Sequence, residues 1–398
     1  ATGAAAAAIV DVRPEGISED APLLMVKDAT AALEDLGSAA RQRTEAKIIA
    51  VTGSVGKTGT KEALRFVLES QGSCIASRGS FNNHWGVPLS LSRMPAETAF
   101  GIFEIGMNHA GEITPLTKMV SPHVAVITNV EAVHSEYFDS IAAIADAKAE
   151  IFQGLGPHGI AVINRDNGLY DHLHALADAA DVNTIIGFGG HPEAQVRLTQ
   201  VHFDADGSTI VVLIDGNELT YRVGLPGRHW AMNSLAVLAA VYAAGGVVTD
   251  AAAALSDLPG LKGRGRRHTV TMDGGTFIVI DESYNASPVS VRAALEVLGQ
   301  MQPETGGRRI AVLGDMLELG EQSEAAHIGL ADTLIAQSID LVFTAGPWMT
   351  GLAAALPNAM RGGSADTAAE VCGNVTDAVR PGDVIVVKGS AGSNTGPI

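Results

Sequence analysis

The sequence is poor in cysteine and basic residues, and it has no long hydrophobic run. Its two cysteines, Cys74 and Cys372, lie far apart and without metal-ligand spacing, so a reducing compartment is expected. Lysine and arginine number 26 against 44 acidic residues, and the net charge of −18 argues against a general nucleic-acid binder. No apolar stretch approaches the roughly 18 to 20 residues that cross a bilayer. We therefore predict a cytoplasmic protein without a membrane span.

The remaining composition is typical of well-packed globular domains. Hydrophobic residues make up 46% of the chain and charged residues 18%, which excludes a disordered protein. At 398 residues the chain exceeds one ordinary domain. Apolar segments alternate with helix-compatible segments, and this order predicts parallel α/β sheets that bind ligands at the carboxyl ends of their strands. Segments 196–201, 209–214 and 219–223 alternate in polarity and are predicted to form a small antiparallel subdomain.

Residues 48–61, IIAVTGSVGKTGTK, predict a phosphate-binding loop between a strand and a helix. Gly53 and Gly56 let the backbone turn tightly and approach a phosphate. Lys57 is expected to reach the β- and γ-phosphates, and the Thr58 hydroxyl to bind Mg²⁺. Two residues separate the glycines, rather than the four of the commonest form. The alternative is a glycine-rich turn with a solvated lysine, but the flanking strand and helix favour a nucleoside triphosphate site.

Three further polar side chains are candidates for the same site. Glu104 ends the predicted strand 99–105, and beside a Gly-Lys-Thr loop such a carboxylate favours a Mg²⁺ ligand. His134 follows the predicted strand 124–128, although a lone histidine is more often structural. Lys148 lies on an alanine-lined helix, and the residues alone predict a lysine whose ammonium group is exposed at the surface.

Two loops are richer in polar or glycine residues than a simple connection requires. Residues 78–88, RGSFNNHWGVP, contain Asn82 and Asn83 and are predicted to be a binding loop. Residues 258–267, LPGLKGRGRR, are basic and glycine-rich and are predicted to be a domain boundary.

Beyond this boundary, polar loops follow three successive predicted strands. They are 281–288 (DESYNASP), 314–320 (GDMLELG, with Asp315) and 388–390 (KGS, with Lys388). The first could also be a capping turn for the helix that starts at 288, because Asn285 and Ser287 are good cap residues. Three such loops in succession are difficult to explain as three caps.

These motifs resemble, in the same order, those of the Mur ligases, the ATP-dependent amide-forming ligases of peptidoglycan synthesis. The resemblance covers the chain from about residue 45 to its end. Its runs FNN, SYNASP and GDMLELG point to the branch that adds D-alanyl-D-alanine. The matching runs are TGSVGKTGTKE (52–62), FNNHWGVPLSL (81–91), FEIGMNHAGEI (103–113), ITNVEAVH (127–134), AKAEIF (147–152), LPGRHWAMNSL (225–235), DESYNASPVSVRAAL (281–295), LGDMLELG (313–320) and VKGS (387–390).

The resemblance implies a family fold of three domains, of which this sequence is expected to contain two. Residues 47–262 are predicted to form the central ATP-binding domain, with a phosphate-binding loop on a parallel sheet. Residues 263–398 are predicted to form a Rossmann-like α/β ligase domain. Residues 1–46 are expected to be the tail and linker of a first domain that is largely missing ahead of residue 1, and a few residues are expected beyond Ile398.

The resemblance also implies roles for individual residues. ATP and two Mg²⁺ ions are the expected cofactors, and Lys148 is expected to be carbamylated, which turns a cation into an anionic metal ligand. Catalytic roles are implied for Lys57, His134 and Lys148, and substrate contacts for Asn82, Asn83, Asp315 and Lys388. The implied metal ligands are Thr58, Glu104, His134 and Lys148. The implied ATP contacts are Gly53, Ser54, Val55, Gly56, Lys57, Thr58, Gly59, Asn233, Arg264, Glu282, Tyr284 and Asn285. Glu282 stands where the resemblance leads one to expect an aspartate with a ribose contact, and His84-Trp85 departs from the commoner sequence.

The implied reaction joins D-alanyl-D-alanine to a UDP-N-acetylmuramoyl-tripeptide through an acyl phosphate. The implied protein is bacterial and monomeric, and the third residue of the tripeptide is not predicted. One alternative is a related ligase for another amino acid, such as a folylpolyglutamate or cyanophycin-type synthetase. The other is a nucleotide-binding module that is inactive because the first domain is absent.

Overall fold

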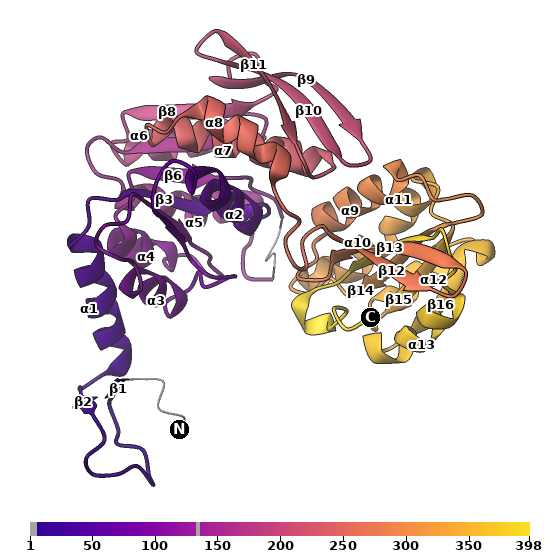
Figure 1. Ribbon diagram of the computed structural model, residues 1–398, viewed down its shortest axis with the longest axis horizontal. Helices are drawn as coiled ribbons and strands as arrows, with labels where there is room; N and C mark the ends of the chain where they lie inside the picture. Colours follow the sequence, from indigo (N-terminus) through magenta and orange to yellow (C-terminus); the bar gives the residue numbers. More distant parts are fainter. Residues whose placement is uncertain (1–5, 133–135) are drawn as a thin grey trace.

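The computed structural model describes residues 6–132 and 136–398. Its helices and strands form two bodies, each built on its own β-sheet, and a two-stranded projection at the N-terminal end (Figure 1). In the ranges described, no helix is long and apolar enough to cross a membrane.

The first body is organised on a nine-stranded sheet with the strand order β11-β10-β9-β8-β7-β6-β3-β5-β4. Strands β3 to β9 pair in parallel, whereas β9, β10 and β11 pair antiparallel. The antiparallel strands therefore extend the same sheet. The strands are β3 (Lys47–Thr52), β4 (Cys74–Ala76), β5 (Phe100–Glu104), β6 (Val124–Ile127), β7 (Ile160–Asn164), β8 (Thr184–Gly189), β9 (Val196–Asp204), β10 (Gly207–Ile214) and β11 (Asn217–Val223).

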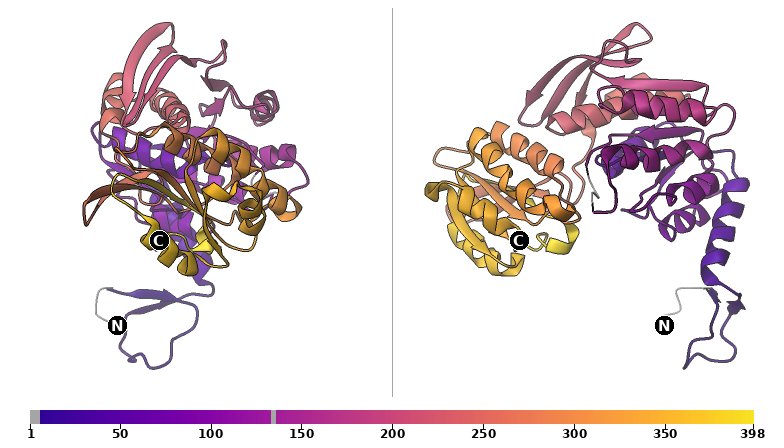
Figure 2. Two further views of the ribbon diagram at one scale, coloured as in Figure 1. Left: turned by 90° about the vertical axis from the view of Figure 1, so that its right-hand side faces the viewer. Right: turned by 180° about the vertical axis from the view of Figure 1, so that it is seen from behind.

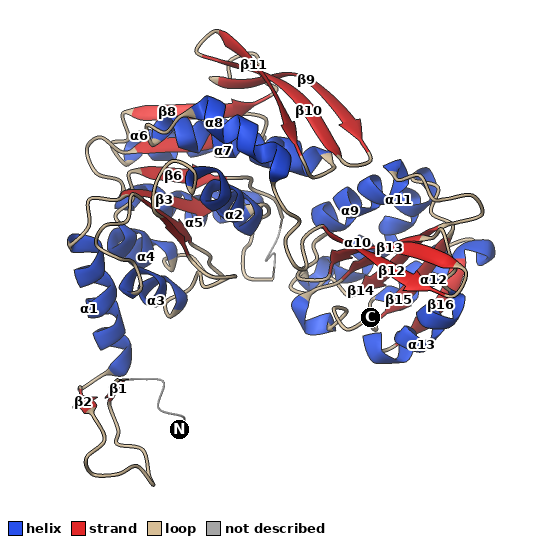
Figure 3. Ribbon diagram, in the orientation of Figure 1, coloured by secondary structure: helices blue, strands red, loops and turns tan. Residues whose placement is uncertain are grey.

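Helices cover both faces of this sheet (Figure 3). Successive side chains of a strand point to opposite faces, so Ile49 and Val51 of β3 enter one core while Ile48 and Ala50 enter the other. The first core is covered by α2 (Lys57–Leu68), α7 (Arg228–Ala243) and α8 (Val248–Ala254). The second is covered by α3 (Gly86–Ser92), α4 (Ile113–Val120), α5 (Ile141–Ala149) and α6 (Tyr170–Ala179). Strands buried on both faces explain the continuous apolar runs in the sequence.

The N-terminal projection consists of a strand pair and a helix that extend away from the sheet (Figure 2). Strands β1 (Ala8–Val10) and β2 (Leu23–Met25) pair in parallel, and α1 (Ala29–Gln42) leads from them to β3. The sequence predicts Asp28 as the cap of a helix that runs to about Arg43. The structure confirms this cap, because the Asp28 carboxylate accepts the backbone N–H groups of Thr30 and Ala31.

The second body is a six-stranded sheet with the order β12-β13-β17-β14-β15-β16, in which β12 and β13 pair antiparallel and the rest in parallel. Its helices also lie on both faces (Figure 3). The strands are β12 (Arg266–Met272), β13 (Gly275–Glu282), β14 (Arg309–Gly314), β15 (Leu341–Ala345), β16 (Arg361–Ala365) and β17 (Val384–Lys388). The helices are α9 (Pro288–Gln300), α10 (Ser323–Ile328), α11 (Leu330–Ala336), α12 (Met349–Ala355) and α13 (Ala368–Ala378).

The structure corrects three predicted segments. The predicted loop 78–88 gives way to α3 at Gly86, because Pro88 lies in the first helical turn, where a proline needs no N–H partner. The sequence pattern also predicts one helix over 324–337, but the structure has two helices divided at Gly329, a residue of low helix propensity. The boundary predicted at 258–267 already contains the start of β12 at Arg266.

The two bodies contact each other through polar side chains. The Arg267 guanidinium of β12 forms a 3.0 Å ion pair with Asp206 in the turn between β9 and β10, and it also donates to the Ala205 carbonyl. The Tyr284 hydroxyl donates to Ser80 Oγ, so the loop after β13 reaches the loop after β4.

Candidate active site

The loop between β3 and α2 has the backbone that the sequence predicts for phosphate binding. Gly53 and Gly56 adopt φ values of 147° and 85°, a region that favours glycine. Side chains are also excluded sterically, since a Cβ would lie 2.0 Å from Thr128 Oγ1 at Gly53 and 2.7 Å from Asn233 Oδ1 at Gly56. Helix α2 begins directly after this loop without a side-chain cap among the described residues. Its first turn is therefore available to an anion.

Neighbouring segments hold the remaining residues of this loop. The Ser54 N–H donates to the Asn129 carbonyl at 2.8 Å, and the Val55 carbonyl accepts the Thr128 hydroxyl at 2.6 Å. On the other side, a Cβ at Gly59 would lie 3.4 Å from the Asn233 amide. The loop is thus fixed by the end of β6 and packed against α7.

The Lys57 side chain folds over its own loop. Its ammonium donates to the Gly53 carbonyl at 2.7 Å and to the Ser54 carbonyl at 3.3 Å. Burial lowers the pKa of Lys57; the Glu104 carboxylate opposes this change, and the positive charge of Arg264 adds to it. Arg264 therefore lies within electrostatic reach of the loop, although it belongs to the segment that leads into the second body.

Glu104 brings together side chains from three segments. The carboxylate is 1% exposed; its Oε2 accepts the Thr58 hydroxyl at 2.8 Å, and its Oε1 accepts the Asn82 amide at 2.8 Å. A hydroxyl, a carboxylate and an amide form the oxygen-rich set that suits Mg²⁺. Within residues 6–132 and 136–398 no group of three His, Cys, Asp or Glu side chains could hold a metal. A Mg²⁺ ion at this position would therefore be bound by one carboxylate together with neutral hydroxyl and amide oxygens, and not by a cluster of acidic side chains.

Lys148 is buried, so the exposed position predicted from the residues alone is wrong. Lys148 lies in the last turn of α5 and is 2% exposed. Its side-chain nitrogen has no hydrogen bond or ion pair to any described residue. Burial lowers its pKa well below the usual lysine value, and the nearby positive charge of Lys57 lowers it further. The structure thus places a buried amine with a lowered pKa within electrostatic reach of Lys57 in the phosphate loop. His134 lies outside the described residues.

The predicted nucleotide contacts from the second body lie around one aromatic ring. The Arg264 guanidinium stacks 4.2 Å from the centre of the Tyr284 ring, and the Tyr284 N–H donates to the Gly263 carbonyl. Tyr284 is 37% exposed and bonds Ser80 in the first body. Asn285 is exposed and does not cap α9, whose cap is Ser287.

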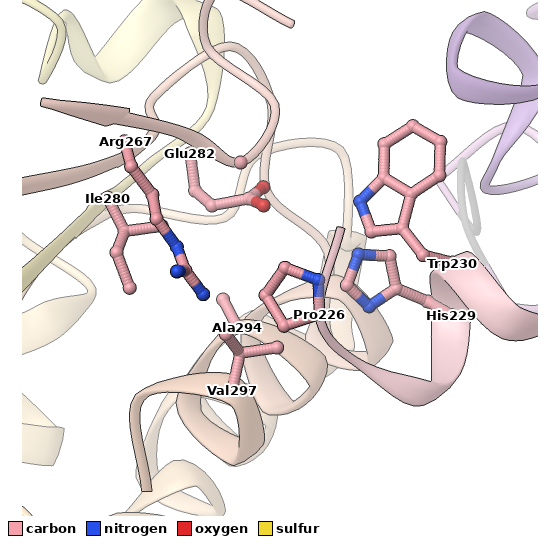
Figure 4. Close-up of a pocket in the computed structure, with 9 residues that line it drawn as sticks. Pro226, His229, Trp230, Arg267, Ile280, Glu282, Ala294 and Val297 are labelled. Carbon is pink, nitrogen blue, oxygen red and sulfur yellow. The ribbon is translucent and has the colours of Figure 1, made fainter. Parts of the chain in front are cut away.

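A small pocket separates the two bodies beside these residues. Figure 4 shows His229 and Trp230 of α7 on one side and Glu282 with Arg267 on the other. Burial lowers the pKa of His229, which the Glu282 carboxylate partly opposes. Glu282 lies 3.4 Å from the Lys388 ammonium.

The four predicted substrate residues occupy different surroundings. Asn82 donates to Glu104, whereas the Asn83 side chain accepts the N–H groups of Trp85 and Gly86 at the start of α3. The Lys388 ammonium is buried and donates to the Asn285 carbonyl at 2.9 Å. Burial lowers its pKa, and the Glu282 carboxylate opposes that shift.

Asp315 is the fourth predicted substrate residue and lies inside the second body. It is 5% exposed, its Oδ1 has no hydrogen bond among the described residues, and burial raises its pKa. His327 lies 4.0 Å away, but its Nε2 accepts the Met316 N–H at 2.9 Å and its Nδ1 bonds the Ser323 carbonyl. Both ring nitrogens of His327 are therefore engaged with the backbone.

One side chain at this site was not predicted from the sequence. Lys61 of α2 is fully buried and its ammonium reaches the loop that carries Asn82. A signal was present, because Lys61 is spaced three and seven residues from Leu64 and Leu68 and so shares their buried helical face.

Comparison with known proteins supports one family for nearly the whole chain. Residues 51–241 match the Mur ligase middle domain, and residues 265–391 match the Mur ligase, glutamate ligase domain. The UDP-N-acetylmuramoyl-tripeptide–D-alanyl-D-alanine ligase of Rickettsia prowazekii is 32% identical over 387 residues, which cover 97% of this chain and 85% of the relative.

Solved structures agree with this match. A crystal structure of MurF from Acinetobacter baumannii superimposes with a TM-score of 0.84 at 29% identity and covers 97% of this chain and 82% of that one. MurF ligase from Thermotoga maritima, solved in complex with ADP, shares the fold with a TM-score of 0.80 at 24% identity and covers 97% of this chain and 86% of that one.

Proposed function

The chain belongs to the Mur ligase family, and we propose that it joins D-alanyl-D-alanine to the carboxyl end of a UDP-N-acetylmuramoyl-tripeptide. It is an ATP-dependent ligase of peptidoglycan synthesis. The observation that carries the proposal is the meeting of Lys57, Thr58 and Glu104 at the carboxyl edge of the first sheet. A phosphate-binding loop beside a buried carboxylate is what the metal-bound triphosphate of this reaction requires.

The reaction has two steps. The substrate carboxylate attacks the γ-phosphorus of ATP, the bond to the β-phosphate oxygen breaks, and an acyl phosphate and ADP form. The free amine of D-alanyl-D-alanine then attacks the acyl carbon, phosphate leaves, and the amine loses a proton as the amide forms. Because two anions meet in the first step, Lys57 contributes by neutralising charge and by holding the phosphates in place.

The predicted contacts are assigned to ATP as part of the same proposal. The loop residues Gly53, Ser54, Val55, Gly56 and Gly59 surround the phosphates. The base and ribose contacts are Asn233, Glu282, Tyr284 and Asn285, and Arg264 is assigned to the γ-phosphate. These assignments are supported by the stacking of Arg264 on Tyr284 and by the pocket beside Glu282. Asn82, Asn83, Asp315 and Lys388 are assigned to the two substrates.

Two Mg²⁺ ions are part of the proposal. Thr58 and Glu104 would hold one of them, and Lys148 with His134 the other. Bound Mg²⁺ neutralises phosphate charge and orients the reacting oxygens. A carbamate on Lys148 is supported by its lowered pKa, since addition of CO₂ requires a neutral amine and releases one proton. The Lys148 side chain would thereby exchange a positive charge for a negative one.

The domain division at 47–262 and 263–398 remains a proposal, as do a monomeric state and a cytoplasmic location. The division is supported by the two separate sheets and by their polar contacts at Arg267 and Tyr284. Rotation of the second body about the glycine-rich segment 260–265 would close the site over ATP. The absence of a membrane-crossing helix among the described residues is compatible with the location.

A phosphate-release assay tests the function. The protein is given ATP, Mg²⁺ and UDP-N-acetylmuramoyl-tripeptide, with either D-alanyl-D-alanine or glutamate as the amine. Release that depends on both substrates and prefers D-alanyl-D-alanine is expected. Preference for glutamate would favour a folylpolyglutamate-type ligase. ATP binding without phosphate release under any combination would favour a nucleotide-binding module.

A further inference from the structure

Lys61 is a fully buried lysine whose position the proposed reaction does not explain. It lies on α2, one turn after Lys57, and its side chain is 0% exposed. A buried ammonium is costly unless charged and hydrogen-bonding partners surround it. Lys61 has three such partners: the Ser77 carbonyl at 2.6 Å, the Gly79 carbonyl at 2.9 Å and the Glu62 carboxylate at 2.7 Å.

Two of these partners belong to the segment 77–83, which runs from β4 toward α3. This segment carries Asn82, whose amide donates to Glu104, and Ser80, which accepts the Tyr284 hydroxyl. Its first residue also contacts the site, because Ser77 Oγ accepts the Glu104 backbone N–H at 3.1 Å. Lys61 therefore connects the helix of the phosphate loop to a segment that touches Glu104 at two points.

The segment has few regular backbone bonds of its own. Its Phe81 and Asn82 N–H groups donate to the carbonyls of Arg78 and Ser80 within the same loop. Its bonds to β5 and the residues that follow are at its two ends, where Ser77 N–H donates to the Ile102 carbonyl and the Asn82 carbonyl accepts the Gly106 N–H. The Lys61 ammonium is bonded to the Ser77 carbonyl at the first of these ends and to the Gly79 carbonyl in the turn that follows. An apolar residue would fill the same volume without fixing the carbonyls.

We infer that Lys61 is a positioning residue, which fixes segment 77–83 on helix α2 and thereby sets the distance between Asn82, Glu104 and the phosphate loop. Its ammonium does not contact the reacting groups. The expected effect on ATP and Mg²⁺ binding rests on the proposed function. The fixing of segment 77–83 by Lys61 does not, because it is a property of the ligand-free protein.

Hydrogen–deuterium exchange of the ligand-free protein measures that property directly. In the wild type, we expect the hydrogen-bonded amides of 77–83 to exchange through the same slow opening as those of α2. Lys61→Met, which keeps the volume of the side chain but removes its donors, should accelerate exchange in 77–83 by about tenfold or more. Lys61→Arg restores charge and donors and should return part of the protection.

Metal dependence supplies the second readout. Binding of a fluorescent ATP analogue is measured at increasing Mg²⁺ concentration. Lys61→Met should raise the Mg²⁺ concentration at half-saturation about 10- to 100-fold, which is the usual effect of losing a residue that orients a metal ligand. The matched control is Arg65→Met. Arg65 is on the same helix and also bonds Glu62, but its hydrogen bonds among the described residues go to Glu62 and Glu69 and not to 77–83. Its Mg²⁺ titration should be unchanged.

The outcomes separate this inference from the proposed function. A Lys61→Met variant with a lower melting temperature but unchanged exchange in 77–83 would show a merely structural lysine and overturn the inference. If the variant does not fold, the wild type alone provides the test. Exchange of 77–83 that is much faster than exchange of α2 in the wild type would also overturn the inference. Failure of the phosphate-release assay would remove the proposed reaction, yet it would leave the exchange result intact.

Discussion

The Thr58 hydroxyl donates a 2.8 Å hydrogen bond to Oε2 of Glu104, although the two residues are 46 positions apart in the chain. They meet because Thr58 lies in the first turn of the helix after β3 and Glu104 ends β5, and these parallel strands are direct neighbours. The pair links the phosphate loop to the buried carboxylate that is proposed to bind Mg²⁺.

Replacing Lys57 by alanine should abolish ATP turnover and leave the fold intact. The ammonium bonds carbonyls of its own loop and no core side chain, so its loss removes charge from the phosphate site without opening a cavity. We expect phosphate release to fall by on the order of 10² to 10³ or more, as for other preorganised charge-stabilising groups. Lys118→Ala, at an exposed position on α4, is the control. A folded Lys57→Ala protein with wild-type turnover would refute the central assignment.

Glu104→Gln should weaken the response to Mg²⁺. The substitution keeps the shape of the side chain but removes the negative charge that Thr58 and Asn82 both donate to. One of these donors would also face the new NH₂ group, so a loss of about 1 to 3 kcal/mol in the free energy of unfolding is expected. Phosphate release is measured against Mg²⁺ concentration, and the half-activating concentration should rise at least about tenfold. Exposed Glu97→Gln is the control; coincident curves for Glu104→Gln and wild type would exclude a metal role.

Lys148→Ala should lose most of the activity, and short carboxylic acids should restore part of it. The buried amine has no partner among the described residues, which is the setting expected for a lysine that carries a carbamate. Acetate can occupy the space left by the side chain and supply the missing carboxylate. Phosphate release is measured over an acetate series at constant ionic strength, with chloride as the control anion. Full activity of Lys148→Ala without acetate would show that the assignment is wrong.

Stability should depend on pH through Lys148. Its folded-state pKa is lowered, so between that pKa and the unfolded value of about 10.4 the unfolded chain binds a proton that the native protein does not. The free energy of unfolding therefore rises with pH in this window, by about 1.4 kcal/mol for each pKa unit of difference. Lys148→Met should remove that rise and be more stable than wild type at neutral pH. Urea unfolding from pH 7 to 9.5 in CO₂-free buffer measures both; parallel curves for the two proteins would contradict this prediction.

Much of the fold could be predicted from the sequence because its signals are local. The apolar runs that form β3, β5 and β6 are buried on both faces of a sheet, and the glycines around Lys57 meet a backbone requirement within a few residues of themselves. The helix cap at Asp28 was likewise predicted from its own neighbourhood. Such features depend on chain stereochemistry and burial, which the sequence encodes directly.

The tertiary structure decided what depends on distant segments. Lys148 looked like a surface lysine on an alanine-rich helix, and its burial follows from the packing of α5 against the sheet. Asn82 became a partner of Glu104 because β4 and β5 are neighbours, and the fixing of its loop requires the ammonium of Lys61 from a helix beside that edge. Periodicity shows which residues share a face of one element. The approach of two faces, and the charges left buried between them, are determined by the packing of the whole chain.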